Sequence, residues 1–120
     1  LVGYSGGSEF ITRYFFPHRA NDIETGGFLV FGGGDAPGPE WTGSFSQYAK
    51  SNLSLNLVTG EPDRTADYDA LGGAQEAAAF YRSAGFEHVW SHWPREHDHT
   101  TITHEFGTYL GTVIDAYDEE

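Results

Sequence analysis

The sequence contains no cysteine, which excludes disulfides, thiol nucleophiles and thiolate metal sites. Basic residues are also scarce: six lysines and arginines stand against 18 acidic residues, and the formal net charge is −12. A field of that sign repels phosphate and anionic lipid, so neither nucleic acid nor a membrane surface is an expected partner. No apolar run approaches the length that spans a bilayer.

Apolar and aromatic residues are plentiful enough for a core, at 38% and 16% of the chain. Strands are predicted at 1–2, 27–31, 53–59 and 88–93. Helices are predicted at 9–16, where Pro17 should end the helix, at 41–50 more weakly, at 70–84, and from 102 to 117. The run GFLVF at 27–31 is typical of a strand buried on both faces of a parallel sheet. Alternating strands and helices predict an α/β fold with a mostly parallel sheet and flanking helices.

The motif that carries chemistry is Gly3-Tyr4-Ser5-Gly6-Gly7, a G-x-S-x-G sequence between a predicted strand and a predicted helix. Such a strand-to-helix turn is tight and strained, requires small neighbours, and lifts the serine hydroxyl above the sheet edge. We therefore predict that Ser5 is a nucleophile. The N–H of Gly6 would donate to the oxyanion.

A serine nucleophile needs a base and an acid, in the chain order Ser, Asp, His for this type of turn. Asp63 follows the predicted strand at 53–59, and His97 follows the strand at 88–93. Loops at the carboxyl ends of parallel strands meet at one edge of the sheet, so we predict Asp63 as the acid and His97 as the base. Asp67 and Asp69 stay open as alternative acids, and His99 as an alternative base.

The order strand–GYSGG–helix, strand–G-x-x-D, strand–loop–His–helix resembles the C-terminal half of the α/β-hydrolase fold. The stretches GYSGGSEFITRYFFP and GGFLVFGGG are similar to esterases of the feruloyl-esterase and polyhydroxyalkanoate-depolymerase kind. The resemblance implies that residues 1–120 form the C-terminal portion of one α/β-hydrolase-like domain without its N-terminal strands. It also implies hydrolysis of small or polymeric carboxylic esters through an acyl-enzyme, without cofactor or metal, and favours secretion.

That resemblance implies a partner as well. A complete α/β-hydrolase has strands before the serine turn, and one of their loops supplies a second oxyanion donor. We therefore expect an N-terminal half, either as a second chain or as an upstream segment.

Two other functions fit parts of the sequence. The histidines between His92 and His104, together with Asp98, could bind zinc as a metal module or metal-dependent hydrolase. The aromatic residues could instead form a non-catalytic surface that binds carbohydrate or a protein partner; the candidates are Trp41, Tyr48, Trp90 and Trp93.

Overall fold

A computed structural model describes residues 1–23 and 26–118 of the chain, with the backbone alone for 116–118. Four strands form one sheet in the order β1 (Val2–Tyr4), β2 (Gly26–Phe31), β3 (Leu53–Val58) and β4 (His88–His92). Every neighbouring pair is parallel, which confirms the predicted α/β class. Because the strands are parallel and lie in chain order, the loops that leave β1, β3 and β4 emerge at the same sheet edge.

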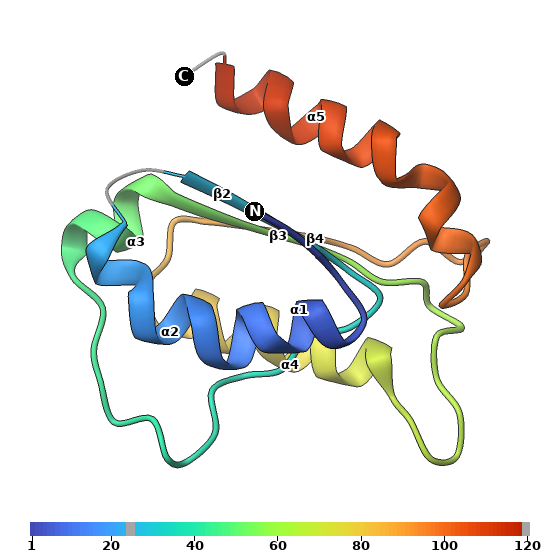
Figure 1. Cartoon of the computed structure of the whole chain (residues 1–120), viewed down its shortest axis with the longest axis horizontal. Helices are drawn as coiled ribbons and strands as arrows, with labels where there is room; N and C mark the ends of the chain where they lie inside the picture. The colour runs from blue at the N-terminus through green and yellow to red at the C-terminus, as the bar shows by residue number, and fades with distance from the viewer. Residues whose placement is uncertain (24–25, 119–120) are drawn as a thin grey trace.

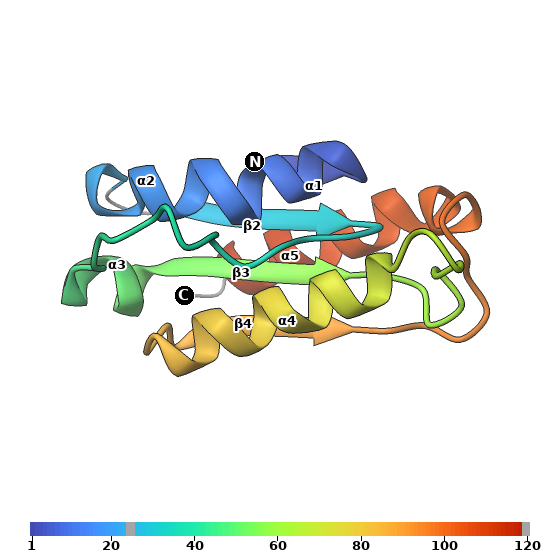
Figure 2. The same cartoon turned by 90° about the horizontal axis from the view of Figure 1, so that it is seen from below.

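Helices cover both faces of this sheet (Figure 1). After β1 the chain forms α1 (Gly6–Phe10), a π-helical turn (Ile11–Phe15), α2 (Phe16–Arg19) and a 3-10 turn (Ala20–Asp22). Then follow α3 (Gln47–Asn52), α4 (Ala70–Ser83), a 3-10 turn (Thr101–Glu105) and α5 (Phe106–Asp118). Helices α1, α2 and α4 lie on one face and α5 on the other, as the view turned by 90° also shows (Figure 2).

The prediction that Pro17 ends the first helix is wrong, because the helical run continues to Arg19. A proline inside an α-helix lacks an N–H and clashes with the carbonyl four residues earlier. The wider π-helical turn before it relieves that problem: Phe16 N–H reaches the Ile11 carbonyl, five residues back. The Thr12 carbonyl, five residues before Pro17, instead accepts a hydrogen bond from the Tyr81 hydroxyl. Tertiary contact thus supplies the donor that proline lacks.

The weak helix predicted at 41–50 is displaced: the structure has α3 at Gln47–Asn52. Side-chain hydrogen bonds explain where it begins. The Asn21 amide donates to the Ser44 carbonyl and accepts from the Ser46 N–H. The Ser46 hydroxyl then accepts from the Ala49 N–H, as a helix N-cap does. Asn21 therefore holds the preceding backbone out of the helix.

Two apolar clusters enclose the sheet. The larger lies under α1, α2 and α4 and includes the fully buried rings of Phe16 and Tyr81. The smaller lies under α5 and consists of buried residues from β2, β3 and the last 3-10 turn: Leu29, Phe31, Val58 and Ile102. Strand residues alternate between the two faces, which explains why β2 contributes to both clusters. No helix within the described ranges has the length and apolarity needed to cross a bilayer.

Candidate active site

Ser5 occupies a strained turn between β1 and α1. Its φ of 55° and ψ of −117° make it the one non-glycine residue with positive φ in the described part of the chain. Its N–H donates to the Phe31 carbonyl at 2.9 Å, which anchors the turn to the neighbouring strand. Gly6 is the first residue of α1, so its N–H has no partner within the helix. The turn therefore presents a hydroxyl and an unused backbone donor side by side.

The glycines of the motif do not all have the same role. A Cβ on Gly3 would come within 2.7 Å of Ile11 Cδ1 and 3.1 Å of the Gly7 backbone, so the close approach of β1 and α1 requires glycine there. A Cβ on Gly7 or Gly6 would meet nothing within 4 Å. A small residue is therefore needed at Gly3, as expected. At Gly7 a side chain has room, and only the backbone of this residue lies close to Gly3.

His99 links Ser5 to Asp63. The His99 Nε2 lies 3.0 Å from Ser5 Oγ, and its Nδ1 lies 2.7 Å from Asp63 Oδ2. Asp63 is 3% exposed, and it follows β3 in a turn closed by its N–H donating to the Gly60 carbonyl. A carboxylate only accepts hydrogen bonds, so Nδ1 carries the proton and Nε2 is free to accept from the serine hydroxyl. The three groups thus form a hydroxyl–imidazole–carboxylate relay at one sheet edge.

The prediction of His97 at this position is wrong. Its Nδ1 lies 3.4 Å from Thr101 Oγ1 and its Nε2 lies 3.6 Å from Glu105, on the side of the last 3-10 turn. The cause is the path of the backbone over Gly60, where a Cβ would come within 1.7 Å of the His97 carbonyl oxygen. With the backbone of residue 97 held against the loop after β3, its ring lies beside Thr101 and Glu105, and His99 reaches Ser5.

Asp98 fixes the turn between these two histidines. Its carboxylate accepts hydrogen bonds from the Thr100 N–H, the Thr101 N–H and the Thr101 hydroxyl. The bonds from Thr101, followed by the one from Thr100, lower the pKa of the Asp98 carboxyl. Asp98 is therefore used to shape the loop that delivers His99.

Two tyrosines that the sequence analysis did not single out enclose His99. The Tyr4 ring stacks on the imidazole with centroids 5.1 Å apart, and its hydroxyl donates to the His99 carbonyl. The Tyr68 ring meets the imidazole edge-on at 5.4 Å, and its hydroxyl donates to the Gly32 carbonyl at 3.3 Å. Gly32 has φ of 66°, and a Cβ there would lie 3.0 Å from Tyr4 and 3.3 Å from His99. In the sequence, one feature pointed to this enclosure: Tyr4 is part of the GYSGG motif and lies next to Ser5.

Burial and negative charge keep both tyrosines protonated. Desolvation raises the pKa of the Tyr4 hydroxyl, and the charges of Asp63 and Asp98 raise it further. Desolvation is also the main cause that raises the pKa of Tyr68, opposed by its hydrogen bond with Ser5. Both hydroxyls therefore remain hydrogen-bond donors around the relay.

The alternative acids lie away from His99. Asp67 is exposed, and its N–H donates to the Thr65 hydroxyl. Asp69 is the N-cap of α4, where its carboxylate accepts from the Gly72 N–H, and it also pairs with Arg64. The structure therefore brings Asp63, rather than either alternative, to the histidine.

The residues of the two other functional hypotheses are dispersed. Across residues 1–23 and 26–118, no three His, Asp or Glu side chains converge as a metal site. His92 stacks on Trp90, and His104 is exposed. Of the aromatic candidates, Trp41 stacks on Phe45 and Trp93 packs against the larger core cluster, whereas Tyr48 and Trp90 are exposed. The four do not form one aromatic surface.

Comparison with known proteins gives no match: no family model, no curated protein and no solved structure is similar to this chain. The case for function therefore depends on the geometry of Ser5, His99 and Asp63.

Proposed function

We propose that this chain is a serine hydrolase that cleaves carboxylic esters through an acyl-enzyme on Ser5, with His99 as base and Asp63 as acid. The observation that carries the proposal is the double contact of His99, 3.0 Å to Ser5 Oγ and 2.7 Å to Asp63 Oδ2. Nucleophile, base and orienting group in that sequence of contacts are the features by which a catalytic triad is recognised. The strained backbone of Ser5 adds to it, because such strain gathers at functional sites.

Each group has a defined task in the proposed reaction. Ser5 Oγ attacks the ester carbonyl while its proton moves to His99 Nε2, and the imidazolium then protonates the departing alcohol. Asp63 stabilises that imidazolium and keeps the proton on Nδ1. In the second half-reaction a water replaces Ser5 as nucleophile, and the acid and Ser5 are released. The Gly6 N–H, unpaired within α1, stabilises the negative charge that develops on the carbonyl oxygen.

The order of the site in the fold supports a relation to the α/β-hydrolase fold. Ser5 follows β1, Asp63 follows β3 and His99 follows β4, in a parallel sheet whose last helix covers the face opposite α1 and α4. This is the arrangement that the resemblance of GYSGG and its downstream loops implies. The choice of an ester as substrate comes from that resemblance.

An N-terminal complement, as a second chain or an upstream segment, is part of the proposal. Within the described residues, β1 pairs only with β2, and Leu1 and Val2 beside the unpaired edge are 61% and 47% exposed. A cavity of about 250 Å³ adjoins them, and Leu110 and Ile114 of α5 help to line it. An open strand edge beside apolar side chains is a surface that proteins normally cover. A further strand and helix would cover it and supply the second oxyanion donor.

A fluorophosphonate probe tests the catalytic assignment, because it reacts with an activated serine hydroxyl. We expect labelling of the wild-type protein at Ser5, none in Ser5→Ala, and almost none in His99→Ala. His97→Ala is the matched control, since it removes an imidazole two residues away that does not contact Ser5; it should be labelled at close to the wild-type rate. Unlabelled wild-type protein, or equal loss in the two histidine variants, would contradict the proposal.

A further inference from the structure

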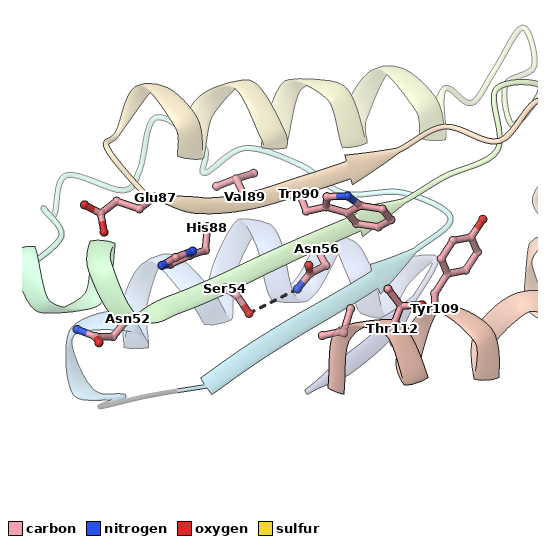
Figure 3. A pocket seen from close by; sticks show the side chains of 10 residues that line it. Asn52, Ser54, Asn56, Glu87, His88, Val89, Trp90, Tyr109 and Thr112 are labelled. Carbon is pink, nitrogen blue, oxygen red and sulfur yellow. Dashed lines mark hydrogen bonds between the residues drawn. The ribbon is translucent and has the colours of Figure 1, made fainter. Parts of the chain in front are cut away.

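A second cavity lies far from Ser5, on the face of the sheet that α5 covers. It has a volume of about 300 Å³, at the lower end of the range for small-molecule sites. Its walls are residues of β3 and β4, the end of α3 and the side of α5 that carries Tyr109 and Thr112 (Figure 3). The residues that carry polar or aromatic groups into it are Asn52, Ser54, Asn56, Glu87, His88, Trp90, Tyr109 and Thr112. We refer to it as the α5 cavity.

Hydrogen bonds within the protein orient the two asparagine side chains of the α5 cavity. The Asn52 amide donates to the Tyr48 carbonyl at 2.9 Å and the Asn56 amide to the Phe28 carbonyl at 3.0 Å. A backbone carbonyl can only accept, so in each asparagine the amide nitrogen must face it. Each side-chain oxygen, Oδ1, therefore takes no part in that hydrogen bond and can accept one from a ligand. Asn56 is almost wholly buried, at 9% exposure, which fixes this orientation.

The same reasoning applies to two other residues. His88 Nε2 lies 3.1 Å from the Ser51 carbonyl, so this nitrogen carries the proton and Nδ1 of the neutral ring is an acceptor. The Thr112 hydroxyl donates to the Thr108 carbonyl at 3.0 Å, which leaves its oxygen lone pairs. The Ser54 hydroxyl, which accepts from the Asn56 amide at 3.5 Å, keeps its own proton to donate. The Asn52 amide has a second N–H, and the Trp90 indole and the Tyr109 hydroxyl are donors as well. The cavity therefore offers a set of acceptors beside these donors: both asparagine Oδ1 atoms, His88 Nδ1 and the Thr112 oxygen.

Charge and aromatic surface add to this pattern. Glu87 belongs to none of the ion pairs found among the described residues. Trp90 is 43% exposed; its ring stacks on His92 and lies 6.4 Å from the Tyr109 ring. Burial raises the pKa of Tyr109, and the negative charges of Glu105 and Glu96 raise it further, so its hydroxyl stays protonated.

A ligand that donates hydrogen bonds to these acceptors, carries positive charge and presents some apolar surface suits these walls. The face of an indole attracts cations, and so does the carboxylate of Glu87, which lines the same cavity. The net charge of −12 draws cations and repels anions over the whole molecule. We infer that the α5 cavity is a binding site for a small organic cation with N–H donors, such as a primary amine attached to an apolar group. This inference does not depend on the proposed esterase.

The test uses 2-phenylethylamine as the probe and 2-phenylethanol as a neutral molecule of similar shape. Tryptophan indole N–H resonances of the ¹⁵N-labelled protein report binding, because the three tryptophans are separate probes and Trp90→Phe identifies the relevant one. We expect the amine to shift the Trp90 resonance saturably with a Kd on the order of 1 mM, leaving that of Trp41 in place. The alcohol should bind at least about tenfold more weakly, since it lacks the charge.

Two charge-neutralising variants then locate the cation. Glu87→Gln should weaken binding of the amine about three- to fivefold, as expected for one partly exposed charge pair. Glu40→Gln is the matched control, because it removes the same charge from a residue that pairs with Arg13 and does not line the cavity; it should bind as wild type. Unshifted Trp41 and Trp93 resonances establish that each variant is folded. Absence of a saturable shift, equal binding of the alcohol, or equal weakening by both variants would overturn the inference.

Discussion

Replacing Asp63 by asparagine isolates what the carboxylate contributes to the proposed triad. The substitution keeps size and shape but removes the charge from a side chain that is 3% exposed and 2.7 Å from His99 Nδ1. Because the site is buried, water has little access to it and does little to replace the lost charge. If the amide NH₂ faces the imidazole, Nδ1 must lose its proton and Nε2 must carry it, so His99 can no longer accept from Ser5. If the amide oxygen faces it, the imidazolium loses its counter-charge.

We expect Asp63→Asn to lower kcat/KM for a p-nitrophenyl ester by roughly four orders of magnitude, as the equivalent change does in serine-protease triads. That loss corresponds to about 5 kcal/mol of transition-state stabilisation. Initial rates against wild type, with folding checked by circular dichroism, provide the measurement. Asp67→Asn is the matched control on the same loop, where the carboxylate is exposed, and it should change the rate less than about twofold. A folded Asp63→Asn protein within tenfold of wild type would refute the role of Asp63.

Two further predictions concern stability. Gly3→Ala should destabilise the protein by about 1–2 kcal/mol in urea unfolding, because the new Cβ meets Ile11 at 2.7 Å. Gly7→Ala is the control: its Cβ has open space, so the free energy of unfolding should change by less than about 0.5 kcal/mol. Equal effects of the two substitutions would contradict the packing argument. Tyr81→Phe should cost about 1–2 kcal/mol, because it leaves the Thr12 carbonyl buried without its donor; an unchanged unfolding midpoint would show that the hydroxyl is not needed there.

The elements with a strong local signal could be predicted from the sequence. The run Gly27–Phe31 is apolar throughout because β2 is covered on both faces, and that composition predicted a parallel-sheet strand. The turn at Ser5 could be recognised because a strained strand-to-helix turn restricts its neighbours, as the close contact of Gly3 with Ile11 now explains. Asp63 could be chosen over Asp69 because it follows its strand directly, whereas Asp69 lies where a helix N-cap is expected.

The choice between His97 and His99 depends on contacts that form when the chain folds. The two residues lie in the same loop and carry the same chemistry, so spacing along the chain cannot distinguish them. What distinguishes them is the contact of the His97 carbonyl with Gly60, 37 residues earlier in the sequence. It leaves the His97 ring beside Thr101 and Glu105 and brings the His99 ring to Ser5. The continuation of the helix through Pro17 has a similar origin, since Tyr81 supplies a hydrogen bond that no local signal contains. In both cases the deciding partner is distant in sequence, and only folding brings it into contact.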